Sequence, residues 1–373
     1  MNKNQNDQAF MAEALRLAAK GLYTTRTNPR VGCVIVKDGE IIGRGFHLSP
    51  GNPHAEVLAL EDVKQNSKGS TIYVNLEPCS HHGKTPPCAE ALAAAKVSRV
   101  VTAMTDPNPL VNGQGLKLLQ SHGIKTKTNV LKSEATELNK GFIKRITNGR
   151  PYLTVKSAIS LDGKTALQSG ESKWISSNES RTDVQKLRAR SCAIMTGIDT
   201  VVTDDPSLNV RLNEEDLGVE DHIEQPKRVI LDTDLRISSS AKILNQTEDV
   251  IIYTCAAENK KSIELKKHNV EIVITKKTNN HVDLNAVMNN LAKRDINEVL
   301  VEAGSTLIGS LLENKLVDEM IIYMAPHIMG DASFGLAKLD SIQAMQDRIE
   351  LNICQTRNIG NDIKLQLKPQ YLN

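Results

Sequence analysis

A histidine and two cysteines in the first half of the chain have the types and the spacing of zinc ligands. His54 stands in His-Ala-Glu at 54–56, and Cys79 and Cys88 bound the run Cys-Ser-His-His-Gly-Lys-Thr-Pro-Pro-Cys. Structural zinc sites are closed by four protein ligands, whereas one imidazole and two thiolates leave a fourth position open for water. Zinc at such a site lowers the pKa of that water from about 15.7 to roughly 7. The three residues therefore predict a catalytic zinc site.

Glu56 is the candidate proton carrier of this site. It follows His54 by two residues, so the two side chains point in different directions from a helix. His-x-Glu followed by Pro-Cys and a second cysteine is the signature of zinc deaminases, in which the glutamate is a general acid and base and not a ligand. Deaminases of nucleosides and nucleic acids have two residues between the cysteines, whereas eight separate Cys79 from Cys88.

The longer loop between the cysteines leaves more than one interpretation open. Its residues His81, His82 and Lys84 would give a small-molecule pocket hydrogen-bond donors and a cation for a phosphate. A zinc completed by His81 or His82 would instead be structural. The two cysteines alone would also suit a buried pair, because free cysteine is often found in cores. The three ligand types together, each at a predicted strand-to-helix junction, favour the catalytic zinc.

The second half of the chain carries a weaker signal, for a phosphate. It lacks the Gly-x-Gly-x-x-Gly fingerprint of a Rossmann domain, but a strand predicted at 298–303 leads into Gly304-Ser305-Thr306 and a helix. A glycine-bearing turn with hydroxyls at a helix start suits a phosphate, and a plain helix N-cap explains the two hydroxyls equally well. These residues alone indicate a phosphate-binding α/β domain.

Alternating strands and helices must position these residues. In the first half, Asp38-Gly39 predicts a hairpin between the first two strands, so the sheet starts with an antiparallel pair and is mixed. The expected strands are 31–36, 40–46, 71–76, 99–104 and 124–130, and the expected helices are 7–20, 55–64, 88–96 and 115–122.

A second α/β pattern begins after turn residues at 147–151, which predicts one domain at 1–147 and another at 148–373. The regions 204–226 and 328–345 are expected to be rich in loops. The expected strands are 151–160, 192–197, 228–232, 249–255, 271–275, 298–303 and 318–326, and the expected helices are 179–190, 283–293 and 306–315.

Composition narrows the class of partner. Among 373 residues, 46 Lys and Arg balance 44 Asp and Glu, and only 3% of residues are aromatic, so the chain lacks the basic field and the stacking platforms of a nucleic-acid binder. No stretch approaches the roughly 18 apolar residues of a membrane helix. The first residues lack the apolar core of an export signal, so we expect a cytoplasmic protein with reduced thiols.

Several motifs of the first half resemble the deaminase domain of the bifunctional riboflavin-biosynthesis family. They are Asn-Pro-Arg-Val-Gly at 28–32, Gly-x-Gly-x-His at 43–47, the Glu-Pro-Cys run at 77–88 and Asp-Pro-Asn-Pro-Leu-Val-Asn-Gly-Gln-Gly at 106–115. That family deaminates and then reduces a diaminopyrimidine ribosylamine phosphate. The resemblance implies a cytidine-deaminase-like α/β/α domain in three layers, with zinc on His54, Cys79 and Cys88 and with Glu56 as proton shuttle.

The same resemblance implies which residues hold the pyrimidine substrate. Many family members have arginine where Lys84 stands, and lysine keeps the positive charge for a phosphate but lacks the bidentate fork. The implied substrate contacts of the deaminase are Asn28, His47, His81, Lys84, Asp106 and Asn108.

From about residue 150 to residue 331 the chain resembles the reductase domain of that family, which is similar in fold to dihydrofolate reductase. The implied reaction is hydride transfer from NADPH to C1′ of the ribosylamino group, which opens the sugar to a ribityl chain. The implied NADPH contacts are Ala158, Trp174, Thr200, Asp204, Gly304, Ser305, Thr306, Leu307, Ile308, Gly309 and Ser310. The implied substrate contacts are Lys156, Ser172, Arg188, Leu208, Arg211 and Glu302.

Two alternatives belong to other classes of function. A nucleoside or tRNA-base deaminase would need the short spacing between cysteines and, for tRNA, a basic surface, and the sequence has neither. The second half would alternatively be a nucleotide sensor that regulates the first, because nucleotide binding does not require turnover. An exposed edge in the second sheet would suit a homodimer or a higher homo-oligomer.

Overall fold

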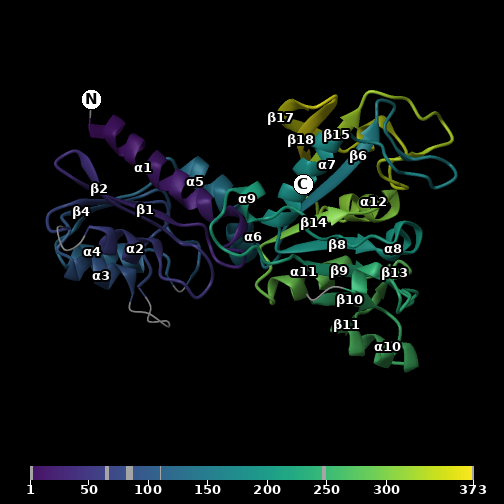
Figure 1. Ribbon diagram of the computed structural model, residues 1–373, viewed down its shortest axis with the longest axis horizontal. Coiled ribbons are helices and arrows are strands. Elements are labelled where there is room, and N and C mark those ends of the chain that lie inside the picture. The colour runs from purple at the N-terminus through teal and green to yellow at the C-terminus, as the bar shows by residue number, and fades with distance from the viewer. Residues whose placement is uncertain (1–2, 64–66, 81–86, 110, 246–248, 372–373) are drawn as a thin grey trace. The chain divides into compact units, whose positions relative to one another are not determined.

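The computed structural model describes residues 3–63, 67–80, 87–109, 111–245 and 249–371 (Figure 1). The chain forms two compact units: residues 1–149 with 218–223, and residues 150–217 with 224–373. Both units consist of helices packed on a β-sheet, so each is an α/β domain as the sequence predicts.

A mixed five-stranded sheet forms the centre of the first unit, in the order β2-β1-β3-β4-β5. Its first two strands are antiparallel, and the turn between them has positive φ at both Asp38 and Gly39, as a tight hairpin requires. β1 also pairs antiparallel with β3, whereas β3, β4 and β5 run parallel. The strands are β1 Gly32–Lys37, β2 Glu40–Phe46, β3 Thr71–Val74, β4 Arg99–Thr102 and β5 Lys125–Lys127.

Helices cover both faces of this sheet, which makes three layers (Figure 1). Alternate β1 residues face opposite layers: Ile35 packs with α2, α3 and α4, and Val34 packs with α1 and α5. The helices are α1 Lys3–Lys20, α2 Ala55–Asp62, α3 Cys88–Ala94, α4 Gln114–Ser121, α5 Lys132–Leu138 and α6 Lys140–Asn148, and η1 Gly21–Tyr23 is a short 3₁₀ turn.

A buried carboxylate fixes α1 on the sheet. Asp7 accepts two hydrogen bonds from Arg99 on β4, both 2.8 Å long, one from Lys127 on β5 at 2.8 Å and one from Tyr73 on β3 at 2.9 Å. Burial alone would raise the pKa of Asp7, but these hydrogen bonds hold it well below its usual range. The carboxylate therefore stays ionised at neutral pH and joins α1 to three neighbouring strands.

A nine-stranded sheet forms the centre of the second unit, in the order β11-β10-β9-β8-β14-β6-β15-β18-β17. The strands from β11 to β15 in this order are parallel, and β18 and β17 are antiparallel additions at one edge. The strands are β6 Tyr152–Ser160, β8 Ala193–Gly197, β9 Lys227–Leu231, β10 Val250–Thr254, β11 Val270–Ile274, β14 Glu298–Glu302, β15 Glu319–Ala325, β17 Glu350–Ile359 and β18 Asp362–Gln370. Two small two-stranded antiparallel sheets pair β7 Lys164–Ala166 with β16 Phe334–Gly335 and β12 Lys277–Thr278 with β13 His281–Val282.

The second sheet is also covered on both faces. One core cluster joins it to α7, α8 and α10, and the other joins it to α11 and α12 (Figure 1). The helices are α7 Asn178–Arg190, α8 Ile198–Asp204, α9 Glu214–Leu217, α10 Lys260–Leu265, α11 Leu284–Ala292 and α12 Ser305–Glu313, with 3₁₀ turns η2 Lys242–Leu244, η3 Lys266–His268 and η4 Met345–Asp347.

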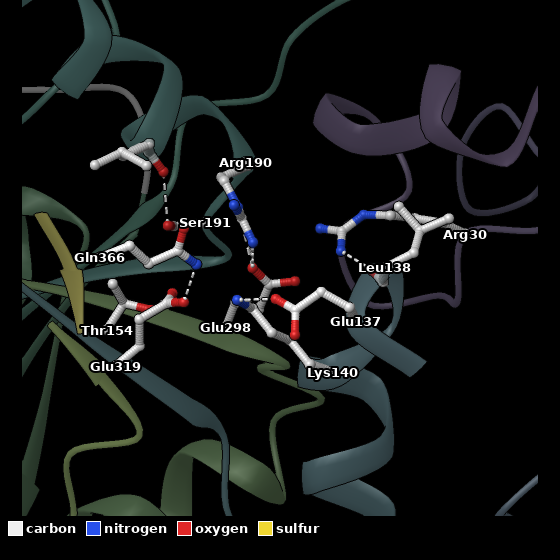
Figure 2. A network of polar contacts seen from close by, with 11 residues as sticks. Arg30, Glu137, Leu138, Lys140, Thr154, Arg190, Ser191, Glu298, Glu319 and Gln366 are labelled. Atoms are coloured by element: carbon white, nitrogen blue, oxygen red, sulfur yellow. Dashed lines mark hydrogen bonds and ion pairs between the residues drawn. The ribbon is translucent and has the colours of Figure 1, made fainter. Parts of the chain in front are cut away.

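Polar side chains link the ends of these elements (Figure 2). In the second unit Arg190, at the end of α7, donates to Glu298 at the start of β14 over 3.1 and 3.3 Å. Glu319 on β15 accepts from Gln366 on β18 at 2.6 Å and from Thr154 on β6 at 3.3 Å. Charged and amide groups thus hold the start of the parallel strands in register.

Candidate active sites

The three predicted zinc ligands meet in the first unit. His54 is the N-cap of α2, and Cys88 is the first residue of α3. The Nδ1 atom of His54 lies 3.2 Å from Cys88 Sγ and 3.6 Å from Cys79 Sγ, and all three ligand atoms lie within 4.8 Å of one another. Tetrahedral zinc with bonds of about 2.0–2.3 Å needs ligand atoms separated by roughly 3.3–3.8 Å, so these residues fit zinc. No other group of three such side chains occurs among the described residues.

The charges of the two thiols also fit a dication. The Cys88 thiol, the His54 imidazole and the backbone N–H of Cys88, which lies 3.3 Å from Cys79 Sγ, lower the pKa of Cys79 to about 4. The pKa of Cys88 is raised, because its hydrogen bond to Cys79 and its burial disfavour a second thiolate beside the first. A divalent cation is the partner that allows both thiols to ionise.

Glu56 lies in the first turn of α2 and is 4% exposed. Burial, and after it the charge of Cys79, raise the pKa of Glu56 to about 7. A carboxyl group that titrates near neutrality both accepts and donates a proton readily, which is the property of a general acid and base. The structure thus places a buried carboxyl group with this property beside the three candidate ligand residues.

His47 lies next to the His54 ring, and Asn28 is hydrogen-bonded to His47. Nδ2 of Asn28 is 2.9 Å from Nε2 of His47, and Nδ1 of His47 is 3.2 Å from the carbonyl oxygen of Pro53. Because that carbonyl only accepts, Nδ1 carries the proton and Nε2 accepts from Asn28. Burial lowers the pKa of His47, which favours this neutral form, and its ring meets the His54 ring edge-on at 5.8 Å between centroids.

Asp106 and Asn108 form a turn in the same unit. The backbone N–H of Asn108 donates to Oδ1 of Asp106 at 2.8 Å, and the N–H of Asp106 donates to Glu77 at 3.1 Å. Glu77 is a residue that the sequence analysis did not single out. The two other implied substrate contacts, His81 and Lys84, lie outside the described residues.

A cleft of about 710 Å³ opens in the second unit near the carboxyl ends of β6, β8 and β14. Ligands of parallel α/β sheets bind at such strand ends. Thirteen of the seventeen residues implied for the reductase line this cleft: Lys156, Ala158, Ser172, Trp174, Arg188, Thr200, Asp204, Leu208, Arg211, Glu302, Gly304, Ser305 and Thr306.

A buried ion pair organises the floor of the cleft. Arg188 on α7 donates from Nε and Nη2 to the two oxygens of Glu302 at 2.6 and 2.9 Å, and from Nη1 to the carbonyl of Asn209 at 2.9 Å. Burial lowers the pKa of Lys156, and the nearby Arg188 lowers it further. The side chain of Arg211 is exposed, and its backbone N–H is held by Gln185 at 2.9 Å. Arg188 is therefore committed to Glu302, whereas Arg211 presents its cation at the cleft.

Trp174 and Asp204 lie at the rim of the cleft. Trp174 is 71% exposed, with the guanidinium of Arg181 4.5 Å from its ring centroid. Asp204 lies 3.5 Å from the Ser172 hydroxyl, and its carbonyl accepts from Lys173 at 3.3 Å. A broad exposed ring beside a cation suits a planar, negatively charged ligand.

Four residues of the implied cofactor set, Leu307, Ile308, Gly309 and Ser310, do not line the cleft. Ile308 is fully buried in the core, and Leu307 packs against it. A Cβ atom on Gly309 would lie 1.8 Å from the Lys338 carbonyl oxygen, so this glycine serves a close backbone approach. Only the first turn of α12 faces the cleft, because the helix runs on into the core.

Other lining residues were not found from the sequence. Ser207 lies next to the implied substrate contact Leu208 in the chain, which is the one local indication of its place. Lys242 and Phe334 also line the cleft, but they come from segments far along the chain in which no motif marks them. Tertiary structure alone brings them to the site.

Known families match both halves of the chain. Residues 4–104 match the family described as the cytidine and deoxycytidylate deaminase zinc-binding region, and residues 151–365 match the RibD C-terminal domain. These matches confirm both predicted fold classes.

Relatives that match almost the whole chain contain the same two domains in one polypeptide. The riboflavin biosynthesis protein RibD of Haemophilus influenzae is 46% identical over 98% of this chain and 98% of its own length. RibD of Escherichia coli is 45% identical over 97% of this chain and 99% of its own length. A crystal form of Acinetobacter baumannii RibD superposes with a TM-score of 0.91 at 42% identity, covering 99% of this chain and 100% of that one. A Thermotoga maritima diaminohydroxyphosphoribosylaminopyrimidine deaminase/5-amino-6-(5-phosphoribosylamino)uracil reductase gives 0.87 at 32% identity, covering 98% and 99%.

Proposed function

The chain belongs to the RibD family of riboflavin biosynthesis, and from this premise we propose which of its residues carry each of the two reactions. It is a bifunctional enzyme, a zinc-dependent deaminase joined to an NADPH-dependent reductase. This function is favoured over a nucleoside or tRNA deaminase with a sensor domain, because the family match extends over both halves. The deaminase activity is assigned to 1–147 and the reductase activity to 148–373.

In the deaminase, His54, Cys79 and Cys88 hold the zinc. Zinc, when bound, lowers the pKa of a water and so supplies the nucleophile that adds to the amino-bearing carbon of the pyrimidine ring. Glu56 accepts the proton of that nucleophile and delivers it to the departing nitrogen, which leaves as ammonia. The pKa of Glu56, about 7, supports both transfers.

Asn28, His47, Asp106 and Asn108 hold the pyrimidine and its ribose. The position of His47 supports this assignment, because its ring contacts the His54 ring and it is hydrogen-bonded to Asn28. His81 and Lys84 belong to the same proposal through the family resemblance, with Lys84 as the cation for the phosphate.

In the reductase, the N-terminus of α12 with its N-cap, Gly304-Ser305-Thr306, binds a phosphate of NADPH. Ala158, Trp174, Thr200 and Asp204 line the rest of the cofactor-binding site. The other implied cofactor contacts, residues 307–310, follow this turn in α12 and anchor it to the core. NADPH, when bound, supplies the hydride that reduces C1′ of the ribosylamino group.

The pyrimidine substrate of the reductase lies against the residues around the Arg188–Glu302 pair. Arg211 binds its phosphate, because Arg188 is already neutralised by Glu302. The substrate contacts are Lys156, Ser172, Arg188, Leu208, Arg211 and Glu302.

The observation that carries the proposal is the His54–Cys79–Cys88 cluster with buried Glu56 beside it. Its test is a product assay on the purified protein with the diaminopyrimidine ribosylamine phosphate, with and without NADPH. We expect ammonia release without NADPH, and NADPH oxidation only once deaminated product exists. Ammonia release with NADPH never oxidised would leave the second half as a sensor. No ammonia from a zinc-loaded sample would contradict the substrate assignment.

No helix among the described residues has both the length and the apolar character that a membrane crossing needs. The substrate is a small pyrimidine, and we propose that the enzyme works in the cytoplasm, where its thiols stay reduced.

We also propose that a second copy of the chain pairs with the edge strand β17. Nine of its ten residues are exposed, among them Ile353 at 67% and Leu351 at 40%. Long unprotected edges of this kind invite another strand. Antiparallel pairing about an axis between Ile353 and Cys354 would place Glu350 opposite Arg357 of the second copy, so the strand is complementary to itself in charge.

Light scattering coupled to gel filtration checks this proposal. We expect the wild-type chain to have the mass of a dimer or a higher assembly and Ile353→Lys to have the mass of a monomer, because a charge would be buried at the axis. Ile274→Lys is the matched control, since Ile274 is 56% exposed on β11, the opposite edge of the sheet. A monomeric wild-type chain would rule the pairing out.

A further inference from the structure

Glu77 is a buried carboxylate to which the two reactions assign no part. It is 3% exposed and lies two residues before Cys79, between the end of β3 and the zinc ligand. An ionised carboxylate is costly to bury unless its oxygens are fully hydrogen-bonded. The partners of Glu77 therefore indicate what it does.

The Glu77 carboxylate accepts four hydrogen bonds from backbone N–H groups of one downstream stretch, residues 106–116. Oε2 accepts from Asp106 at 3.1 Å and from Gly113 at 2.9 Å. Oε1 accepts from Gly115 at 3.0 Å and from Leu116 at 3.3 Å. One side chain thus bridges the turn that starts at Asp106 and the N-terminus of α4, whose positive dipole end favours the negative charge.

The backbone is also in close contact at this point. A Cβ atom on Gly115 would lie 2.0 Å from the carbonyl oxygen of Pro78, so only glycine allows α4 to approach Pro78 this closely. Pro78 stands between Glu77 and Cys79. The segment that ends in the zinc ligand and the start of α4 are therefore held together by packing and by three of these hydrogen bonds, while the fourth holds Asp106.

Asp106 links Glu77 to Asn108 through two hydrogen bonds. Its N–H is bound by Glu77, and its own Oδ1 accepts from the N–H of Asn108 at 2.8 Å. Asn108 in turn closes the turn, because its carbonyl accepts from Val111 at 2.8 Å and from Asn112 at 3.0 Å. Loss of the Glu77 carboxylate would remove a hydrogen bond at Asp106, where this segment starts, and another at Gly113, where it meets α4.

We propose that Glu77 is a positioning residue of the deaminase: its carboxylate sets Asp106 and Asn108 at a fixed place relative to Cys79. This inference rests on the proposed function, in which Asp106 and Asn108 hold the substrate and Cys79 binds the zinc. In this proposal Glu77 itself contacts neither the substrate nor the zinc. It holds the substrate-binding residues in place, so its loss weakens substrate binding and also misplaces the substrate relative to the attacking group.

The experiment compares Glu77→Gln with the wild-type full-length chain. The glutamine amide replaces one acceptor oxygen with a donor, so the N–H groups on one oxygen lose their partner. By hydrogen–deuterium exchange we expect the peptides covering 105–109 and 111–118 to exchange faster, with the 71–76 peptide unchanged. We expect KM for deamination to rise about tenfold with zinc content at one per chain and reductase activity intact.

Glu134→Gln is the matched control, because Glu134 is an exposed carboxylate of α5 in the same unit. Faster exchange with unchanged KM and kcat would overturn the proposal, since the turn would then not position the substrate. So would loss of zinc with normal KM in the remaining enzyme, which would make Glu77 a support of Cys79 alone. Where Glu77→Gln does not fold, Glu77→Asp, which keeps the charge on a shorter arm, is measured in the same way. A wild-type chain that releases no ammonia would instead contradict the proposed function.

Discussion

Glu56→Gln is expected to abolish deamination almost completely while the zinc stays bound. Glutamine has the same shape but carries no titratable proton, so neither transfer assigned to Glu56 is possible. General acid–base catalysis contributes about 100- to 10,000-fold, and we expect kcat to fall by at least about two orders of magnitude. Zinc analysis of the purified variant, with an ammonia-release assay, measures both quantities.

Two controls accompany this variant. Glu61→Gln changes an exposed carboxylate near the end of the same helix and should leave deamination unchanged. NADPH oxidation with deaminated substrate supplied directly should equal that of the wild type, because the reductase residues lie in the other unit. Loss of zinc from Glu56→Gln would mean that Glu56 is a ligand, and the assignment of the proton carrier would then be wrong.

Arg211→Ala is expected to raise KM of the reductase step by about one to two orders of magnitude and to leave deamination untouched. Arg188 cannot take over, because Glu302 and the Asn209 carbonyl occupy its donors. A hydrogen bond between charged groups contributes about 1.5–3 kcal/mol, which corresponds to this range of KM. Initial rates at varied substrate and saturating NADPH measure the effect.

Arg211→Lys, which keeps the charge but loses the bidentate fork, should fall between the wild type and Arg211→Ala. Arg348→Ala removes an exposed arginine of the same unit outside the cleft lining and serves as the control. An equal loss of deamination and reduction in Arg211→Ala would argue that the two sites are not independent.

The zinc site was predictable from the sequence because its parts are local. His54 and Cys88 lie at the starts of helices, which short motifs mark, and Cys79 follows strand β3 in the same Pro-Cys motif. The position of Glu56 relative to His54 also follows from helix geometry alone. In contrast, the hydrogen bond from Asn28 to His47 joins residues that are distant in the chain; the family resemblance implied both residues as substrate contacts, but no sequence pattern predicts the bond between them.

Two other features escaped prediction for physical reasons. The sequence predicts no strand beyond 326, yet β17 and β18 add a long hairpin. In β17 the alternation of apolar and polar residues stops after Ile353, whereas β18 alternates over 363–368, a strand signal in the sequence that the predicted elements do not include. Likewise, the family resemblance places Thr306 and Ile308 in one implied cofactor turn, whereas α12 packs Ile308 into the core with Leu311 and Leu312 and leaves Thr306 at the cleft.

The first compact unit is discontinuous in sequence, since it includes residues 218–223 as well as 1–149. Within this unit, Ser49 lies on the loop that leads to His54, and its hydroxyl donates to Asp221 at 3.0 Å. A polypeptide that stopped at residue 149 would therefore lack a piece of its own domain, and the complementary fragment would carry that piece without the surface it covers. The two catalytic domains therefore cannot be separated by one cut at residue 149. Encoding them as separate proteins would require the first domain to regain a segment equivalent to 218–223 as well as a new terminus.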